Sequence, residues 1–461
     1  MATIDTDYLV IGAGASALAF VDTLLTETDA HITIVDKRDK PGGHWNDAYP
    51  FVRLHQPSSF YGVPSTPLGA ERIDETGTNK GFYELATGVE IAAYFDDVMR
   101  ARFKPSGRVV FLPMTEHVGG DTVRGVLSGE TTRINVRRRL VDARLSENTI
   151  PLTHARQFRV ADGVACAPPN DLPRLAGRFE RFTVLGAGKT AIDSLVWLLE
   201  NGAPPDAVLW APPRDPWLIN RAHVQPTGPF FHATIGGAVR QFEAMSETTS
   251  AEDFADRMEA ADLWLRPDPD VRPAMIHGAT VSPAEIDLVR RVRNVVRRGR
   301  VREIEPDRLV FDDGAQPVAP GALHIDCTAS ALTFHEPVPV FQEDRISIQM
   351  IRLFQPTFSA ALTARIEAED LSDDAKNALA KPTPMTDTVD SWLRSQVISM
   401  MNQYAWSQNK PLRRWIGDCR LDGFARPIRE VNLEDPDYAA VVDRLRALAQ
   451  PAVANAMKLS A

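Results

Sequence analysis

The stretch from Asp7 to Asp36 places the strongest constraint on what this chain can fold into. An apolar run from Tyr8 to Ile11 predicts a short buried parallel strand, and a helical pattern and a second apolar run follow it. Between the first strand and the helix stands Gly12-Ala13-Gly14-Ala15-Ser16-Ala17, and Asp36 closes the second strand 19 positions past Ala17. A G-x-G-x-x-A turn framed by strand, helix, strand and acid at this spacing is typical of a dinucleotide-binding domain.

Each residue type in this motif has a physical role. The first glycine permits a tight turn, the second leaves room for a pyrophosphate, and the start of the helix offers free N–H groups to its charge. Asp36 is placed to accept hydrogen bonds from a ribose. The alternative is a glycine-rich turn in some other α/β protein. We expect the following residues to bind the dinucleotide: Gly12, Gly14, Ala15, Ser16, Asp36 and Lys37.

Composition limits the kind of protein. With 461 residues the chain is long enough for two or three domains, and its net charge of −10 argues against non-specific binding of nucleic acid. No basic and apolar leader precedes the first strand, and no apolar run is long enough to span a bilayer. The three cysteines lie far apart, which fits a reducing cytoplasm and leaves neither a C-x-x-C pair nor a metal-ligand cluster. We therefore expect no bound metal.

A second glycine pair, in Gly42-Gly43-His44-Trp45, opens a loop that extends to about Lys80. Loops of this length are usually functional or disordered, and the aromatic residues of this one favour an ordered loop. Glycine allows backbone to lie close to a ligand, and the Trp45 ring offers a flat apolar surface. Polar side chains further along the loop either face a ring system or are ordinary surface polarity. We assign these residues to the cofactor site: Gly43, His44, Trp45, His55 and Gln56.

Four short strand patterns follow, and their close spacing predicts an antiparallel meander inserted in the first domain. They span residues 109–112, 116–118, 122–127 and 132–136. We include Val118 in the cofactor site, and we interpret Arg137-Arg138-Arg139 as a solvated strand end. Residues 158–167 are expected to return to the sheet.

A second unit repeats the first. The strand Phe182 to Leu185 leads into Gly186-Ala187-Gly188-Lys189-Thr190-Ala191 and a helix, but the next strand is followed by Arg214 and no acid. Arginine at this place is suited to a ribose 2′-phosphate, although an ordinary loop charge is the alternative. Two such units imply two dinucleotides, usually a flavin reduced by a nicotinamide. We expect NADPH to be bound by Gly186, Gly188, Lys189, Thr190 and Arg214.

The last third of the chain contributes a buried strand at residues 323–330 and a helix from Pro356 to Glu367. The positive end of that helix would face the flavin, with Gln355 and Thr357 in the cofactor site. Beyond residue 371 the pattern is helical, and its tryptophans, Trp392, Trp406 and Trp415, are interpreted as core residues rather than a lid.

Together these motifs resemble the flavin-containing monooxygenase-like flavoproteins, related to the Baeyer–Villiger and N-hydroxylating enzymes. The resemblance covers roughly residues 5–370 and rests on both glycine motifs, Asp36, and Gly42-Gly43-His44-Trp45 in place of G-G-x-W. It implies FAD in the first unit, NADPH in the second, an oxygen adduct on flavin C4a, and Gln56 as the side chain that faces the flavin. The chain departs from the family fingerprint F-x-G-x-x-x-H, where Arg181 replaces the histidine, and from the late A-T-G, which reads Cys327-Thr328-Ala329.

We therefore predict an α/β protein with two Rossmann-like dinucleotide-binding domains and a helical C-terminal segment. Residues 1–175 and 325–370 form the first domain, residues 176–324 the second, and residues 371–461 the helical segment. The predicted function is an FAD-dependent, NADPH-using monooxygenase that acts on a small organic molecule with dioxygen, through a C4a-(hydro)peroxide. The alternatives are an oxidoreductase that moves hydride without inserting oxygen, and a non-catalytic redox-sensing flavoprotein. We expect neither nucleic acid nor membrane as a partner, and the patterns do not indicate an oligomeric state.

Overall fold

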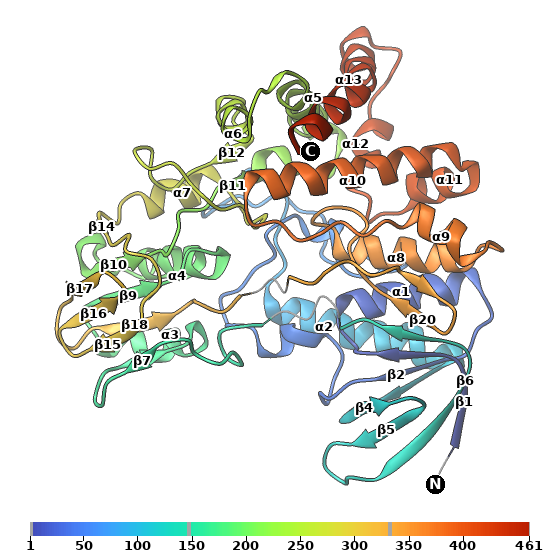
Figure 1. Cartoon of the computed structure of the whole chain (residues 1–461), viewed down its shortest axis with the longest axis horizontal. Coiled ribbons are helices and arrows are strands. Elements are labelled where there is room, and N and C mark those ends of the chain that lie inside the picture. The colour runs from blue at the N-terminus through green and yellow to red at the C-terminus, as the bar shows by residue number, and fades with distance from the viewer. Residues whose placement is uncertain (1–2, 145–148, 331–333, 461) are drawn as a thin grey trace.

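Two mainly parallel sheets dominate the computed structural model, which describes residues 3–144, 149–330 and 334–460. Figure 1 shows them toward opposite ends of the long axis, with the C-terminal helices, in orange and red, along the upper side over the middle and right of the view. The first sheet has the order β19-β20-β6-β1-β2-β3. Its strands are β1 (Thr3–Ile11), β2 (Ile32–Val35), β3 (Val109–Leu112), β6 (Thr131–Asp142), β19 (Phe341–Gln342) and β20 (Arg345–Ser347). β1 pairs in parallel with β2 and β6. The predicted α/β fold class is confirmed.

The predicted four-stranded meander is wrong in its first member, and its last strand continues beyond the predicted end. β3 pairs in parallel with β2, so it belongs to the main sheet. Only β4 (Thr115–Gly119) and β5 (Thr122–Gly125) form a hairpin, which pairs antiparallel with the start of β6. β6 then runs on beside β1 as far as Asp142. Arg137 and Arg139 therefore lie within a strand rather than at its end, and they pair with Asp7 and Asp373.

The second sheet is parallel throughout and has the order β14-β10-β9-β18-β8. Its strands are β8 (Cys166–Ala167), β9 (Phe182–Leu185), β10 (Val208–Ala211), β14 (Asn294–Val295) and β18 (Leu323–Asp326). β18 pairs with β9 along its whole length, so a domain boundary between residues 324 and 325 falls inside a strand of this sheet. β8 likewise joins the second sheet ahead of the boundary expected after residue 175.

Two small sheets complete the strands. One has the order β17-β16-β15-β7 and the other β12-β11-β13. Their strands are β7 (Arg159–Val160), β11 (Leu218–Asn220), β12 (Trp264–Leu265), β13 (Thr280–Val281), β15 (Glu303–Glu305), β16 (Arg308–Phe311) and β17 (Gly314–Pro317).

The helices pack on and between the sheets. They are α1 (Ala15–Glu27), α2 (Gly88–Val98), α3 (Leu172–Leu175), α4 (Lys189–Glu200), α5 (Phe231–Glu247), α6 (Ala251–Ala260), α7 (Pro283–Val289), α8 (Pro356–Glu367), α9 (Asp373–Leu379), α10 (Val389–Gln408), α11 (Lys410–Asp418), α12 (Ala425–Arg429) and α13 (Pro436–Ser460). None of the described helices combines the length and apolarity needed to cross a membrane.

Helices α1 and α8 are buried and pack against each other, which brings the late part of the chain to the first glycine turn. Helix α8 has the bounds predicted for it. In the C-terminal segment, Trp392 stacks on Phe254 and Trp406 is buried beside α8, so the predicted core role of these two tryptophans is confirmed. Trp415 packs on the first unit only in part and donates its indole N–H to Glu27.

Candidate cofactor site

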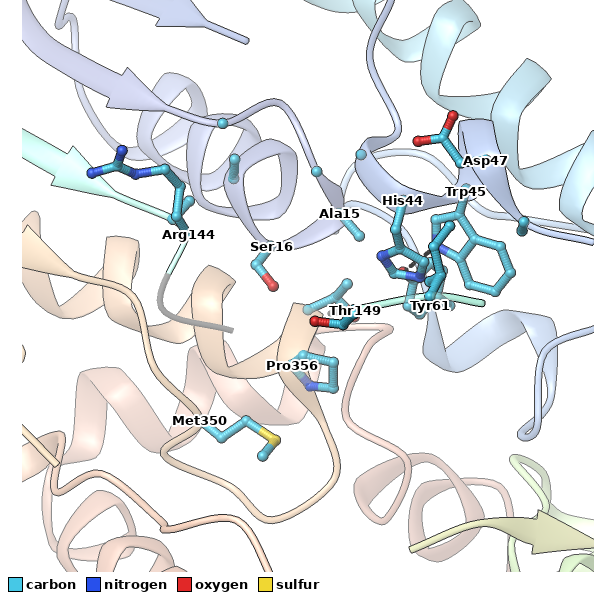
Figure 2. A pocket seen from close by; sticks show the side chains of 18 of the residues that line it. Ala15, Ser16, His44, Trp45, Asp47, Tyr61, Arg144, Thr149, Met350 and Pro356 are labelled. Carbon is cyan, nitrogen blue, oxygen red and sulfur yellow. Dashed lines mark hydrogen bonds between the residues drawn. The ribbon is translucent and has the colours of Figure 1, made fainter. Parts of the chain in front are cut away.

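A cavity of about 690 Å³ lies along the C-terminal ends of β1 and β2 and extends to the second unit. Its walls come from both glycine segments of the first unit, the loop at 52–61, the start of β4 and the start of α8. Thr190, His277 and Ala329 line it from the second unit. Figure 2 shows side chains from these walls converging on one space. The volume is typical of a site for an organic ligand.

The floor of the cavity is backbone without side chains. Gly12 has a φ of +99°, and Gly42 donates its N–H to Ala13 O at 2.8 Å. A Cβ built on Gly43, whose φ is +59°, would lie 2.9 Å from the Gly14 Cα. The two glycine segments therefore interlock, and no residue with a side chain fits at 43 without moving backbone.

The N-terminus of α1 opens on this floor without a cap. No side chain bonds to its first turn, which contains no acid, and Ala15 and Ser16 line the cavity (Figure 2). By contrast, α2 begins with a capping box made by Thr87 and Glu90. Uncapped N–H groups and the positive end of the helix dipole form a ready site for phosphate.

Asp36 is buried at the end of β2 and lines the cavity. One carboxylate oxygen accepts from the Ala13 N–H at 2.6 Å, and the other accepts from the Arg38 N–H at 2.8 Å. Each carboxylate oxygen has a further lone pair, so a ribose hydroxyl can still donate to Asp36. Lys37 lines the cavity next to it.

His44, Trp45 and Tyr61 form one side wall (Figure 2). The Trp45 indole N–H donates to the Tyr61 hydroxyl at 2.7 Å, and burial raises the pKa of that phenol. Burial, aided by the positive charge of Arg38, lowers the pKa of His44 to about 4. The wall is therefore neutral near pH 7.

His55 and Gln56 lie in the loop wall as predicted for ligand contact. Burial, with Lys189 and Arg221 nearby, lowers the pKa of His55 to about 3, so its imidazole is neutral. Within the described residues the Gln56 amide makes no hydrogen bond, which leaves it available to a bound molecule.

The start of α8 supplies the opposite wall. The side-chain oxygen of Gln355 is buried without a hydrogen-bond partner in the described part of the chain. Such an atom costs about 1–3 kcal/mol, so it indicates a donor on a bound ligand. Thr357 lines the cavity beside it, with its hydroxyl 3.5 Å from the Phe60 carbonyl. Phe354, at a φ of +59°, packs its ring over Gly278 of the second unit.

Val118 is not part of the site. Its side chain is 44% exposed, and the cavity is lined instead by the three residues before it, Thr115, Glu116 and His117. Val118 lies further along β4, toward the hairpin turn, at a register shift between residues 117 and 119. Sequence reasoning also missed Arg144, Thr149, His277 and Thr383, which line the cavity but have no motif around them.

The second glycine turn has the backbone of a nucleotide site. Gly186 has a φ of +116°, and a Cβ there would lie 2.4 Å from the Cys327 carbonyl oxygen. A Cβ on Gly188 would meet nothing within 4 Å, and α4 begins without a side-chain cap or an acid. Thr190 lines the cavity, whereas the Lys189 ammonium is buried among carboxylates, where it contacts Asp193 and bonds to Glu285 at 3.1 Å. The structure therefore removes the Lys189 side chain from the phosphate site.

Arg214 is engaged by a residue far along the chain. Its two terminal nitrogens donate to Asp387 at 3.0 and 2.6 Å, and His277 contacts the same carboxylate at 2.7 Å. The hydrogen bond from Arg214 is the main cause that lowers the pKa of Asp387 to about 2. Arg214 does not line the cavity, although its neighbour His277 does.

Two mainly parallel sheets each lead into a glycine turn and an uncapped helix, and one cavity reaches from the first turn to Thr190 at the start of α4. These features define a dinucleotide-binding protein with two Rossmann-like units. The family model for the NAD(P)-binding Rossmann-like domain matches residues 10–55, which confirms the motif predicted there. Uncharacterised proteins from Mycobacterium bovis and Mycobacterium tuberculosis are 45% identical over 431 residues, which is 92% of this chain and 78% of theirs. The chain belongs to the family of these mycobacterial proteins.

Similar solved structures include two monooxygenases of the group that the motifs resemble. One is a flavin-containing monooxygenase from Stenotrophomonas maltophilia, with 14% identity, coverage of 79% of this chain and 97% of that one, and a TM-score of 0.42. Another is a cyclohexanone-bound cyclohexanone monooxygenase, with 15% identity, coverage of 82% and 87%, and a TM-score of 0.49. A third is a bacillithiol disulfide reductase from Staphylococcus aureus, with 10% identity, coverage of 79% and 98%, and a TM-score of 0.47.

Proposed function

We propose that this protein is a flavin-dependent oxidoreductase that holds FAD in the first unit, with a nicotinamide nucleotide at the second. The observation that carries the proposal is the cavity that reaches from Gly14 and Asp36 in the first unit to Thr190 at the start of α4 in the second. Dinucleotides placed at the two turns would extend toward each other through this cavity. Hydride transfer needs that arrangement.

The residues present fit FAD. Gly14 and Gly43 leave the backbone bare where a pyrophosphate would lie, and Asp36 keeps acceptor capacity for the ribose. At the other wall, the unpaired Gln355 oxygen would accept a hydrogen bond from the flavin ring. A flavin, when bound, supplies the hydride acceptance and the electron transfer to dioxygen that no side chain can perform.

The protein's own residues would position the flavin and keep water away from it. His44 and Tyr61 form a neutral wall that excludes water from the ring, and the Gln56 amide would orient it by hydrogen bonding. We propose NADPH as the electron donor, with its pyrophosphate at the open backbone of Gly188. Arg214 would release Asp387 and bind the 2′-phosphate in its place.

We further propose that the overall reaction is monooxygenation of a small organic molecule by dioxygen. The enclosing wall at Trp45, Phe60 and Tyr61 supports it, because exclusion of water protects a reactive oxygen species from decay. The cysteines are free thiols, so the described chain offers no disulfide as an electron acceptor.

Isotopically labelled dioxygen tests the proposal. We expect the purified protein to be yellow, to oxidise NADPH faster with its substrate present, and to incorporate label into the organic product. Asp36→Ala protein, prepared in the same way, controls for unbound flavin. If the label appears only in hydrogen peroxide for every member of a broad panel of small organic molecules, the protein is an oxidoreductase that does not insert oxygen. A protein that binds no FAD would overturn the whole proposal.

A further inference from the structure

A cluster of four charged side chains is buried between the two units. Lys189 and Asp193 come from α4, Glu285 from α7, and Arg221 from the segment after β11. Their side chains are 1–11% exposed, and Glu285 pairs with Lys189 at 3.1 Å and with Arg221 at 2.7 Å. Charged groups are buried so deeply only when they are paired, and this cluster sets two basic side chains against two acidic ones.

The cluster separates the cofactor cavity from a second cavity. The second cavity has a volume of about 410 Å³ and is lined by Lys189, Asp193 and Glu285. It reaches solvent, because the Arg53 side chain in its wall is 54% exposed. Neither glycine motif needs this space, and the proposed function does not use it.

One hydrogen bond connects the cavities. Tyr49 lines the cofactor cavity, and its phenol donates to Asp193 at 2.6 Å. Asp193 itself lines the second cavity, so these two side chains lead from one cavity to the other.

We propose that Tyr49 and Asp193 form a path that carries a proton from the second cavity to the cofactor cavity. The inference rests on the proposed function. Oxidation of one NADPH by dioxygen consumes one proton, whether the products are an oxygenated compound and water or hydrogen peroxide. Tyr49 releases its hydroxyl proton into the cofactor cavity, Asp193 takes up a proton from water in the second cavity, and Asp193 passes that proton to the Tyr49 oxygen. Both side chains then return to their starting states, and one proton has crossed.

The surroundings of the path agree with this role. The cavity-lining histidines His44 and His55, with pKa values of about 4 and about 3, are too acidic to hold a proton for delivery near neutral pH. Burial, the main cause, raises the pKa of both Tyr49 and Asp193 and so favours the protonated form of each.

Charges on every side of Asp193 tune this step. Lys189 on its own helix lowers the pKa of the carboxyl, and Glu285 on α7 raises it. Burial, above all, raises the pKa of the Cys327 thiol at the end of β18, so this neighbour of Asp193 is neutral. Lys189, Glu285 and Arg221 are positioning residues, since they hold Asp193 and do not touch the cofactor cavity.

Proton uptake during NADPH oxidation tests the path directly. Flavin-loaded wild type, Tyr49→Phe and Asp193→Asn are mixed with NADPH and dioxygen, and a pH-indicator dye follows uptake in H₂O and in D₂O. We expect both variants to keep their flavin and to take up protons about 10²-fold more slowly, the scale of lost acid–base assistance. Asp193→Glu should recover part of the rate. Tyr83→Phe, which removes a phenol from outside both cavities, should behave as wild type.

A second readout needs no cofactor. In flavin-free protein, a pH titration followed by infrared spectroscopy should show a carboxyl band that is missing in Asp193→Asn and shifted in Tyr49→Phe. Should Asp193→Asn fail to fold, Tyr49→Phe keeps the ion cluster intact and suffices. Wild-type proton uptake in both path variants, with normal turnover, would overturn the path and leave the proposed function standing. Absence of flavin binding in wild type would overturn both.

Discussion

The two glycine turns share one motif and differ in what surrounds it. Both precede an uncapped helix, and the first glycine of each has a positive φ. In the first turn, the residue after the second glycine is Ala15, which lines the cavity. In the second turn the same position is Lys189, whose ammonium is buried in the ion cluster. The motif therefore determines the backbone, and the packing around it decides which way the variable side chains point.

The ends of the adjoining strands differ in the same way. Asp36 is buried and bonded to the turn that precedes α1, so the acid is part of the site before any ligand binds. Arg214 is 40% exposed and bonded to Asp387, nearly half the chain away from the second turn. The first unit is preorganised for its nucleotide, and the second must exchange a contact to bind one. The predictions below test that difference.

Gly43→Ala should have the largest effect. The new Cβ would lie 2.9 Å from the Gly14 Cα, and alanine at a φ of +59° is strained, so the floor of the cavity must shift. We expect the variant to retain less than a tenth of the flavin of wild type, measured as absorbance per protein after gel filtration. Gly188→Ala is the matched control, because its Cβ meets nothing within 4 Å. Equal flavin loss in both variants would show that the close contact between Gly43 and Gly14 is not required for flavin binding.

The stability of flavin-free protein should fall on acidification, and His44 should account for part of the fall. Its pKa is lowered to about 4, chiefly by burial, against about 6.5 when unfolded. Above pH 6.5 the imidazole is neutral in both states, so folding carries no penalty there. As the pH falls from 6.5 to 4, the unfolded state binds the proton more readily and the free energy of unfolding decreases. Between pH 7 and pH 4.5, His44→Gln should reduce this decrease by on the order of 2 kcal/mol, measured by urea unfolding at both pH values. An unchanged pH dependence would contradict it.

Asp36→Ala should weaken FAD binding by roughly ten- to a hundredfold, since a hydrogen bond to a charged group is worth about 1.5–3 kcal/mol. Fluorescence titration of flavin-free protein measures the Kd. Asp39→Ala, which removes an exposed acid from the same turn, is the control. If both variants bind FAD equally well, the role of Asp36 is limited to its hydrogen bonds within the turn.

Gly188→Ala should leave the melting temperature and flavin content unchanged and raise the KM for NADPH several-fold. The site is open in the protein alone, so only a pyrophosphate against the backbone would meet the new methyl group. Steady-state kinetics in both substrates measure the effect. An unaltered KM would place the nicotinamide nucleotide away from the second turn.

Arg214 and Asp387 should give the smallest and most selective effects. Arg214→Ala should raise the KM for NADPH about tenfold and leave that for NADH unchanged, because only NADPH carries the 2′-phosphate. Asp387→Asn should lower the KM for NADPH, since it weakens the competitor for the guanidinium. The ion pair is about 40% exposed, so neither change should cost more than about 1 kcal/mol of stability. If neither substitution changes the KM for NADPH, the role of Arg214 is limited to its ion pair with Asp387.

Local features were predictable because their causes are local. The turn at Gly12 needs a positive φ, and Pro356 favours the first turn of a helix, so the first Rossmann motif and α8 were identified correctly from neighbouring residues. Val118 was assigned wrongly because a strand pattern does not reveal where along the strand a cavity ends. β3 was placed in the wrong sheet because strand pairing depends on partners that a local pattern does not name.

The amino-acid sequence by itself determined the two glycine turns, the acid at the end of β2 and the helices that follow, since each depends on backbone conformation and short-range spacing. Only the tertiary structure decided what those elements face. It brought α8 against α1, set Asp387 on Arg214, and enclosed Lys189 between Asp193 and Glu285. The ion pairs among these contacts join residues from 4 to 173 positions apart, and their energies depend on burial and charge that arise only when the units pack together.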